Sequence, residues 1–351
     1  MKRPLTIVIA LVTTFIAIQV YRGVESSGVF YAIEPHFSGQ CKAISGVTGA
    51  EDITIDHAKQ YAYISADDRR ATMANKPVTG GIYGFDLSNP NATPVLLTQG
   101  FSDDFHPHGI SLYYGEQGKK SLFIINHLSN GIQQVEIFDI SAVNELTYRT
   151  SITYPELITP NDLVAVGPSQ FYATNDHAYP RGSAMQTVED YMGLPLSSVS
   201  FFDGSKGKIV ASGLRYANGI TTTDDLKTVY VAEISGRKIN IYDRDMSNNE
   251  LTKQSEIAIN TGGDNLEWDD KGNLWLGAHP RLLDFVAHAK DPAKDSPSQV
   301  LKIDFSTGQP KVSEIYLSTG NDISASTVAA VSGKTLLIGS VFEDRILRCK
   351  L

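Results

Sequence analysis

An internal repeat is the feature that most limits what this chain can fold into. From residue 51 to its end, the sequence repeats a polar turn, a short apolar strand, a second strand, and a third strand that commonly ends in a Tyr/Phe-Asp pattern. The copies begin at Glu51, His108, Asn161, Asn218, Asp264 and Ser326. The starts are 46–62 residues apart, a spacing typical of propeller blades. We therefore predict an all-β fold, a six-bladed β-propeller, because a β-sandwich would not explain six similar units.

The segment before the repeat reads MKRPLTIVIALVTTFIAIQVYRG. Two basic residues precede an apolar run of roughly 16 residues, which is typical of a secretory signal or a short membrane anchor. The bulky end of the run offers no small-x-small cleavage site, which favours an uncleaved anchor. We expect residues 1–24 to form this hydrophobic helix, in contact with a membrane or lipid surface, and residues 25–351 to form an exported propeller. Elsewhere, one helix is predicted on the rim, over residues 183–194.

The charge of the chain argues against one class of partner. The formal net charge is −9 and the pI is near 5.4. Nucleic-acid phosphates would be repelled, so we expect no nucleic-acid binding. The acidic excess has two explanations: a solvated acidic surface, or partial neutralisation by bound cations.

The chain contains two cysteines, one near each end of the repeat region. Cys41 precedes the first repeat and Cys349 lies near the last residue. In a reducing cell they could stay free, whereas in an exported chain a disulfide that ties the ends is favoured, which would join the first and last blades of the ring. By the loop-entropy model, closing so long a loop would stabilise the fold by about 4–5 kcal/mol or somewhat more.

The starts of the repeats carry oxygen ligands. In a propeller, the innermost strand of each blade begins beside the central channel. Those starts here are Glu51-Asp52, Asn161-Asp162, Asn218 and Asp264-Asn265. Clustered carboxylates are costly to bury without a cation, and hard oxygen ligands without cysteine select Ca²⁺ over zinc or copper. Alternatively, Asn and Asp form the turns between blades. Their recurrence at one phase of four repeats favours the metal.

Two histidines lie close together at the start of the second repeat, in FHPHGIS. Pro107 removes a backbone donor and Gly109 permits a turn, so we expect His108 at the mouth of a strand. The segment LFIINH then predicts a buried strand that delivers His127. Such a pair suits a base, a metal ligand or a pH-sensitive core. His106 is the closest rival to His108, since it lies two positions away along the strand.

Taken in order, these motifs resemble those of the serum paraoxonase/arylesterase family of calcium-dependent lactonases. The matching segments are GAEDITI, FHPHGIS, LFIINH, LITPNDLVAVGPSQFYATNDH, YMGL, YANGI, VYVAE, LWLGAHP, STVA and LLIGSVF. They run from the first repeat towards the last residue, and the ordered set with the terminal cysteines is specific to the family. The N-terminal hydrophobic segment also fits it.

The resemblance implies two calcium ions in the tunnel. The ligands that it implies for the catalytic ion are Glu51, Asn161, Asn218, Asp264 and Asn265. For a deeper structural ion they are Asp52, the backbone carbonyl of Ile110, and Asp162. The resemblance also implies His108 as general base, His127 as its dyad partner, and the Cys41–Cys349 disulfide.

The chemistry of ester and lactone hydrolysis suits these residue types. Hydrolysis builds negative charge on the carbonyl oxygen, which a cation with an open position can hold. Water needs a base near neutral pH, and histidine is the natural one. Since no serine, cysteine or lysine nucleophile is required, we hypothesise a single-step hydrolysis without an acyl-enzyme.

One segment departs from the family pattern. After the first apolar strand, the chain reads Ser65-Ala66-Asp67-Asp68-Arg69-Arg70, where animal paraoxonases carry an apolar lid with a tyrosine. Substrate preference is therefore open. Tyr216, Val341 and Phe342 are the residues that we expect in the pocket wall, and we expect His177 and His279 to form structural hydrogen bonds.

Three functions follow, in order of preference. The first is a calcium-dependent lactonase/arylesterase whose natural substrates are aliphatic lactones, such as acyl-homoserine lactones, rather than aryl esters. The second is a gluconolactonase-like propeller with one metal, which does not need the histidine dyad. The third is a non-catalytic propeller that binds a lipid or protein partner, with calcium as a purely structural ion.

Overall fold

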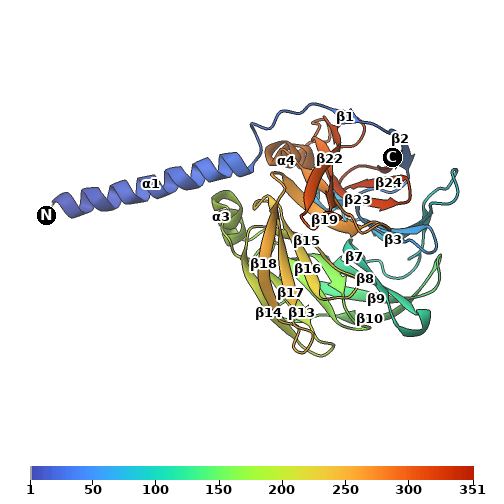
Figure 1. Ribbon diagram of the computed structural model, residues 1–351. Coiled ribbons are helices and arrows are strands. Elements are labelled where there is room, and N and C mark those ends of the chain that lie inside the picture. The colour runs from blue at the N-terminus through green and yellow to red at the C-terminus, as the bar shows by residue number, and fades with distance from the viewer. Residues whose placement is uncertain (1) are drawn as a thin grey trace.

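Six antiparallel sheets form a ring in the computed structural model, which describes residues 2–351 (Figure 1). The predicted six-bladed β-propeller is confirmed, and each predicted repeat start lies at the beginning of an inner strand. The first blade consists of β3 (Ala50–Asp56), β4 (Tyr61–Ala66), β5 (Gly81–Asp86) and β6 (Val95–Leu96). The second consists of β7 (Pro107–Tyr114), β8 (Lys120–His127), β9 (Gln133–Ala142) and β10 (Glu145–Ile152), with a 3₁₀ turn at Glu116–Gly118.

The remaining blades follow in chain order, and the last two also receive strands from the N-terminal part. The third blade consists of β11 (Pro160–Ala165), β12 (Phe171–Asn175), β13 (Ser197–Phe202) and β14 (Gly207–Leu214). The fourth consists of β15 (Ala217–Thr222), β16 (Thr228–Glu233), β17 (Lys238–Arg244) and β18 (Leu251–Ala258). The fifth consists of β19 (Gly262–Trp268), β20 (Leu274–His279), β21 (Ser298–Asp304), β22 (Lys311–Ser318) and β1 (His36–Phe37). The sixth consists of β23 (Ser326–Ser332), β24 (Thr335–Ser340), β25 (Arg345–Lys350) and β2 (Gln40–Ser45).

Burial falls from the inner to the outer strand of a blade. Every residue of β3, β4, β11 and β23 is buried, whereas the outer strand β10 contains no buried residue. The core therefore lies between neighbouring blades. For example, Phe123 of the second blade and Phe171 of the third share one apolar cluster, with ring centroids 6.0 Å apart. Face-to-face packing of blades is what makes each repeat depend on its neighbours.

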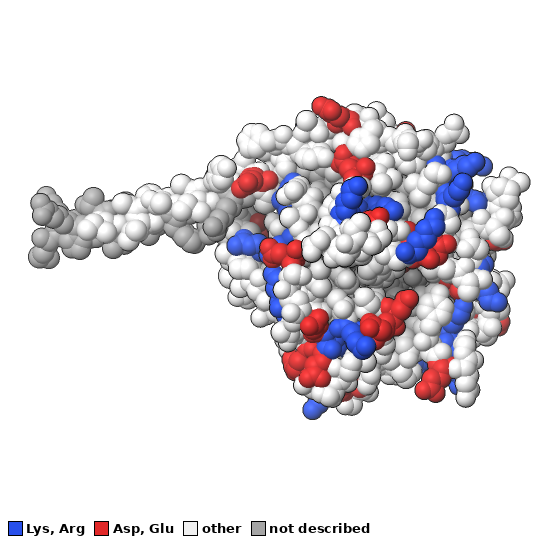
Figure 2. Space-filling model, in the orientation of Figure 1, with Lys and Arg blue, Asp and Glu red and all other residues white. Residues whose placement is uncertain are grey.

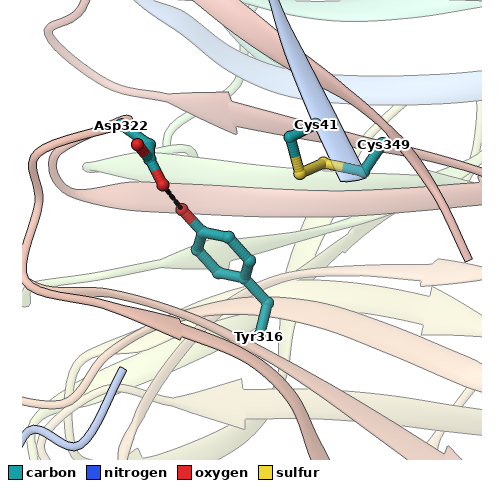
Figure 3. The surroundings of a disulfide bond; sticks show 4 residues. All are labelled: Cys41, Tyr316, Asp322 and Cys349. Carbon is teal, nitrogen blue, oxygen red and sulfur yellow. Dashed lines mark hydrogen bonds between the residues drawn. A yellow bond between two sulfur atoms is a disulfide. The ribbon is translucent and has the colours of Figure 1, made fainter. Parts of the chain in front are cut away.

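The N-terminal strand β2 closes the ring. It pairs antiparallel with β25, and Cys41 lies directly opposite Cys349, to which it is joined by a disulfide (Figure 3). The predicted disulfide is therefore confirmed, but it does not join the first and last blades. It joins two strands of the sixth blade, because β2 crosses over to complete that sheet before the chain enters the first blade. Cys349 also packs with Tyr316 of the fifth blade, so the bond lies where two blades meet.

Three helices lie at one end of the propeller. α2 (Arg69–Met73), α3 (Ala184–Met192) and α4 (Leu282–Lys290) each connect the second strand of a blade to the third, in the first, third and fifth blades. The second strands end opposite the residues at which the inner strands begin, so all three helices share the end at which the repeats start. The predicted rim helix is α3: Ser183 caps it, and Gly193 ends it in the left-handed conformation.

Helix α1 (Lys2–Ser26) projects away from the propeller (Figure 1). Its end is fixed by two hydrogen bonds: Leu282 N donates to the Ser27 carbonyl, and Arg237 donates to the Ser26 carbonyl. Over the described residues, no helix is both long and apolar enough to cross a membrane. On the face seen in Figure 2, basic and acidic side chains are mixed over the propeller rather than sorted into one patch of either sign. The anchor expected from the sequence stays a prediction.

Loss of the disulfide should destabilise the propeller without changing its architecture. The variant Cys41→Ser, Cys349→Ser leaves the hydrogen bonds between β2 and β25 in place but releases the constraint on a loop with a sequence separation of 308 residues. We expect the free energy of unfolding to fall by up to about 4–5 kcal/mol, measured by denaturant unfolding. Equal stability of the variant and the oxidised wild type would contradict this role.

Candidate active site and metal centre

The inner strands share an irregularity at the end where they begin. In every blade, the pairing between the inner strand and the second strand shifts register within the first residues of the inner strand. Such bulges change the direction in which side chains point. The predicted metal ligands sit at this level and are all buried: Glu51, Asp52, Ile110, Asn161, Asp162, Asn218, Asp264 and Asn265.

Five buried oxygen atoms at this level have no hydrogen-bond partner in the described part of the chain. They are Glu51 Oε2, Asn161 Oδ1, Asn218 Oδ1, Asp264 Oδ1 and Asn265 Oδ1. They belong to the five residues assigned to the catalytic calcium on the sequence. A buried polar atom without a hydrogen-bond partner destabilises the fold. These oxygens therefore need a ligand that the protein chain itself does not supply.

The other oxygens of this layer are fixed by specific bonds. Glu51 Oε1 accepts from Asn265 Nδ2 at 2.9 Å, and the Glu51 carbonyl accepts from Thr327 at 2.6 Å. Asp264 Oδ2 lies 2.7 Å from His279 Nε2. In Glu51 and Asp264, one carboxylate oxygen is therefore held by a hydrogen bond, and the other oxygen is left without a partner. His279 has the structural role that the sequence predicts, and it orients a candidate ligand.

Asp52 and Asp162 form the second group of candidate ligands. Asp52 accepts from the N–H of Ile53 and, at 2.7 Å, from that of Ile110 in the second blade. Asp162 repeats this pattern with Leu163 and with Ile220 of the fourth blade. Burial raises the pKa of Asp52 to about 7, and burial followed by the Asp52 charge raises the pKa of Asp162 well above its usual value. Two buried carboxyl groups, of which one raises the pKa of the other through its charge, are suited to a shared cation.

The whole donor set fits a calcium ion better than a transition metal. Within the described residues, no group of three His, Cys, Asp or Glu side chains is arranged to hold a metal. The candidate set instead mixes carboxylate oxygens with amide oxygens. Oxygen-only sets that contain neutral carbonyl donors are typical of Ca²⁺, and the five oxygens without partners satisfy this requirement.

A glycine allows two inner strands to approach each other at His108. A Cβ on Gly109 would lie 2.6 Å from the Asn161 carbonyl oxygen and 2.6 Å from the Asp162 Cα. The prediction that Gly109 forms a turn is wrong: it lies inside β7, and its φ is not positive. Pro107 is the first residue of that strand, a position that tolerates a missing donor. His108 is therefore at the mouth of the strand, as expected.

The two predicted catalytic histidines are in contact. His108 Nδ1 lies 3.1 Å from His127 Nε2, and the rings meet edge to face with centroids 4.9 Å apart. His127 is the last residue of β8, the buried strand predicted to deliver it. On its other side, His108 Nε2 lies 3.5 Å from Glu51 Oε1. The histidine pair therefore adjoins the candidate metal ligands, and only 9% of the His108 side chain is exposed.

Both rings are held in the neutral form. Burial, followed by the charges of Arg69 and His127, lowers the pKa of His108 well below its usual value. Burial, followed by the charge of Arg181, lowers the pKa of His127 to about 3. A neutral imidazole keeps one lone pair free to accept a proton, so the pair is in the state that a general base requires.

Two residues that contact this pair were not identified from the sequence. Gln133, the first residue of β9, places its side-chain oxygen against His127 Nδ1 while its amide nitrogen donates to the Gly131 carbonyl at 3.0 Å. Arg69, the first residue of α2, places a guanidinium nitrogen 3.2 Å from His108 Nδ1. Neither residue falls at the repeated phase that marks the candidate metal ligands, and both contacts depend on how the chain connects the second and third strands of a blade.

The rival histidine has a structural partner. His106 Nδ1 lies 2.9 Å from Asp67, and hydrogen bonding to Asp67 raises the pKa of His106. It precedes β7 and does not share the position of His108. His177 also has the structural role expected for it, since its two ring nitrogens lie 2.8 Å from Asp176 and 2.7 Å from Asp190 of α3.

The residues expected in the pocket wall lie near the three helices. Tyr216 contacts the His177 ring at 4.8 Å and has a positive φ of 57°, a strained conformation for a bulky residue. Phe342 packs against Phe285 of α4, and Val341, which precedes it, is buried. A cavity of about 470 Å³ extends along the inner strands from Asp162 in the opposite direction, away from His108 and His127.

The sequence profile of the arylesterase family matches residues 32–351 of this chain. The serum paraoxonase/arylesterase 2 of Gallus gallus is 34% identical over 330 residues, covering 91% of each chain. The serum paraoxonase/arylesterase 1 of Homo sapiens is 33% identical over 362 residues, covering 98% of this chain and 99% of that protein. The serum paraoxonase/lactonase 3 of Oryctolagus cuniculus is 32% identical over 336 residues, covering 93% of each chain.

Solved structures with the same overall fold are more distant in sequence. A luciferin-regenerating enzyme has a TM-score of 0.55 at 16% identity, covering 90% of this chain and 96% of that one. A protein described as a putative gluconolactonase has a TM-score of 0.54 at 13% identity, covering 92% and 94%. A calcium-binding protein, regucalcin, from Agrobacterium tumefaciens has a TM-score of 0.53 at 13% identity, covering 90% and 95%. At these identities, the likeness is one of fold.

Replacing one unpartnered oxygen should weaken calcium binding. Asn218→Leu removes the amide but keeps a similar shape, so we expect calcium affinity to fall at least about tenfold, measured by competition with a fluorescent chelator. The wild type should also melt at a lower temperature in excess chelator, because an ion bound only by the folded state stabilises it.

Asn91→Leu is the matched control, since Asn91 is an exposed residue of a loop in the first blade. It should bind calcium as the wild type does. Wild-type affinity in Asn218→Leu, or no calcium binding by the wild type, would count against the assignment.

The contacts of His177 should make stability depend on pH. Burial alone would lower its pKa, but hydrogen bonds to Asp176 and Asp190 outweigh this and raise the pKa to about 9. A raised histidine pKa stabilises the fold fully below the unfolded value of about 6.5, and this stabilisation is lost as the pH rises through about 9. We expect His177→Gln to lower the melting temperature more at pH 6 than at pH 10. An equal loss at both values would show that the histidine is not charged in the fold.

Proposed function

Because this chain belongs to the arylesterase family, we propose that it is a calcium-dependent hydrolase of lactones and aryl esters, in which His108, assisted by His127, activates water. Family membership supports the broader class, a hydrolase that acts on esters or lactones. The calcium requirement, the roles of the histidines and the preferred substrate are the proposal. Its substrates are small molecules.

One observation carries the proposal. The buried oxygens without partners are those that the catalytic ion would need, and the histidine pair lies directly beside them, with His108 Nε2 3.5 Å from Glu51. A purely structural metal site would not require a neutral, buried histidine dyad at its edge. This arrangement therefore favours catalysis over a propeller that only binds a partner.

The residues present fit two calcium ions, as the sequence suggests. Those that would hold the catalytic ion are Glu51, Asn161, Asn218, Asp264 and Asn265, each of which offers a free buried oxygen. Asp52, Asp162 and the Ile110 carbonyl would hold the structural ion. When bound, the catalytic ion supplies a Lewis acid that polarises the carbonyl of an ester or lactone. The name of regucalcin, a calcium-binding propeller of similar fold, agrees with this choice of metal.

The hydrogen bonds around His127 determine where His108 can accept a proton. Because the Gln133 amide donates to Gly131, its oxygen faces His127 Nδ1, which must carry a hydrogen. In neutral His127, Nε2 then has the lone pair and can accept from His108 Nδ1–H. Arg69, which can only donate, contacts the same Nδ1 and favours the other tautomer of His108. In the reacting state that we propose, His108 Nδ1–H points at His127, and the lone pair lies on Nε2, the nitrogen that faces Glu51 and the candidate metal ligands.

This tautomer gives the histidines distinct tasks. His108 Nε2 takes a proton from a water molecule as the water oxygen bonds to the carbonyl carbon. The ester bond then breaks, and the same proton passes to the leaving oxygen, which yields a carboxylic acid and an alcohol. His127 holds the His108 ring in the required tautomer and stabilises the positive charge that develops on the His108 ring. Gln133 in turn holds the His127 ring in its tautomer. No acyl-enzyme forms, since no side chain of the protein attacks the carbonyl.

Substrate preference and cell compartment are also proposed. We infer that aliphatic lactones such as acyl-homoserine lactones are better substrates than aryl esters, and one curated relative is named a lactonase. The disulfide is suited to an oxidising compartment, and α1 begins with a basic pair followed by an apolar run. We therefore propose export, as a secreted or membrane-associated protein whose α1 contacts a lipid surface.

Hydrolysis of a long-chain acyl-homoserine lactone by the purified protein tests this function. We expect activity with calcium, loss of activity in chelator, and a decrease of about 10²–10⁴-fold in kcat for His108→Gln, the range attributed to a general base. His36→Gln is the matched control, because the His36 side chain is 47% exposed. Gln133→Leu should lower kcat less than His108→Gln, since it disturbs only the tautomer.

Each result bears on a different part of the proposal. Calcium-dependent activity that survives His108→Gln would remove His108 as the base but keep the metal. A stoichiometry of one calcium with a preference for sugar lactones would favour the gluconolactonase-like alternative. No activity on any lactone or aryl ester, with calcium bound and the fold intact, would favour the binding propeller. A burst of product with trapped covalent enzyme would contradict single-step hydrolysis.

A further inference from the structure

Arg69 presents a fixed positive charge beside the histidine pair. Its guanidinium donates to the Gly49 carbonyl at 3.2 Å, to the Asp67 carbonyl at 3.4 Å and to the Pro107 carbonyl at 3.2 Å. The same nitrogen that reaches Pro107 lies 3.2 Å from His108 Nδ1. These contacts hold the side chain at the end of the propeller where the inner strands begin, and leave it partly exposed.

No carboxylate within the described chain pairs with Arg69 at ion-pair distance. The nearest acidic residues in sequence are used elsewhere: the Asp67 carboxylate contacts His106, and Asp68 caps α2 by accepting from Ala71 N. Arg181, the other cation that acts on the histidines, differs in this respect, since it pairs with Asp176 at 2.8 Å. The fold therefore supplies a partner for one arginine and only carbonyl oxygens for the other.

The charge balance of the proposed holoprotein leaves Arg69 without compensation. Among the candidate calcium ligands, Glu51, Asp52, Asp162 and Asp264 carry four negative charges when ionised, which two calcium ions would balance. Burial raises the pKa of Glu51 well above its usual value, and the charge of Arg69 counteracts this increase. With an ion bound to Glu51, the charge of Arg69 would be available to an anionic group of the substrate.

The tautomer of His108 also frees a donor on Arg69. An Arg69 nitrogen lies 3.2 Å from His108 Nδ1, so its N–H donates there while Nδ1 has the lone pair. In the proposed reacting tautomer, Nδ1 carries a hydrogen that points at His127, and this N–H of Arg69 becomes free for an acceptor on the substrate. A charged guanidinium with one free N–H is suited to a carboxylate, which accepts a charge-assisted hydrogen bond from it.

We propose that Arg69 is a specificity-determining residue that binds a carboxylate carried by the substrate. The substrate class is then a lactone or ester that bears a second, negatively charged carboxylate group near the bond to be cleaved. This inference rests on the proposed hydrolase function and narrows its substrate. It also gives a function to the charged segment 67–70, which stands where the family pattern has an apolar lid.

Matched pairs of substrates separate charge recognition from catalysis. The neutral probes are 4-nitrophenyl butyrate and γ-butyrolactone, and the charged ones are mono-4-nitrophenyl glutarate and the γ-lactone with a carboxylate on the carbon beside the ring oxygen. For the wild type, Arg69→Gln and Arg69→Lys, the measured quantity is kcat/KM for the charged substrate divided by that for the neutral one. Any general effect of Arg69 on the base cancels in this ratio.

The wild type should prefer the charged member of each pair. The ratio should fall about 10- to 100-fold in Arg69→Gln, the range expected for a hydrogen-bonded charge, and Arg69→Lys should restore part of it. Lys227→Gln is the control, because it removes one positive charge from an exposed residue paired only with Asp225. Circular dichroism melts of all variants confirm that each is folded.

Two results would overturn the inference in distinguishable ways. If Arg69→Gln hydrolyses both substrates with the wild-type ratio, Arg69 does not recognise the carboxylate, and the hydrolase function stands. If the calcium-bound wild type hydrolyses neither the charged nor the neutral probes, the proposed function fails and the substrate class fails with it.

Discussion

The crowding of buried oxygen atoms at the start of the inner strands is the constraint on which the rest of the structure depends. Removing an ionised carboxylate from water costs several kcal/mol unless partners replace the lost hydration. Asp52 and Asp162 replace part of it with two backbone N–H groups each, one of which comes from a neighbouring blade. The acidic layer thus joins first to second blade and third to fourth. If these carboxylates hold calcium as we propose, ring assembly and cation binding are coupled, since both depend on the same residues.

A three-residue segment makes this joining possible, and it occurs twice. In His108-Gly109-Ile110 and in Asn218-Gly219-Ile220, the first residue lies at the candidate site and the third donates its N–H to a carboxylate of the preceding blade. The glycine between them touches the next inner strand: a Cβ on Gly219 would lie 2.4 Å from the Asp264 carbonyl oxygen. A larger residue would separate the strands and pull the candidate ligands apart. The motifs HGI and NGI are therefore packing constraints as well as sources of functional side chains.

Periodic features of the structure could be predicted from the sequence, whereas features of the loops could not. The six inner strands and the candidate ligands at their starts follow from the repeat phase, because every blade packs in the same way. The rim helix α3 follows from its capping residues, Ser183 and Gly193. By contrast, the sequence did not predict α2 or α4, since α2 has only five residues and α4 has no side-chain cap at Arg281. The crossing of β2 into the sixth blade was also missed, because β2 lies outside the repeat and its strand pattern does not specify a partner.

Arg69 lies outside the repeated strand pattern, so its position could not be predicted from the sequence. Contacts with neighbouring segments nonetheless fix its position in the fold. Arg70, its neighbour in α2, lies over the Phe342 ring at 4.7 Å and donates to the Phe342 carbonyl and to His288 of α4. These contacts attach a short helix to two other blades. With Arg70 held on one side and the carbonyls of Gly49 and Pro107 on the other, Arg69 has little conformational freedom left to lose. Because a charge placed in advance binds an anion at a lower entropic cost, the selectivity proposed for Arg69 would be a property of the blade packing rather than of a mobile lid.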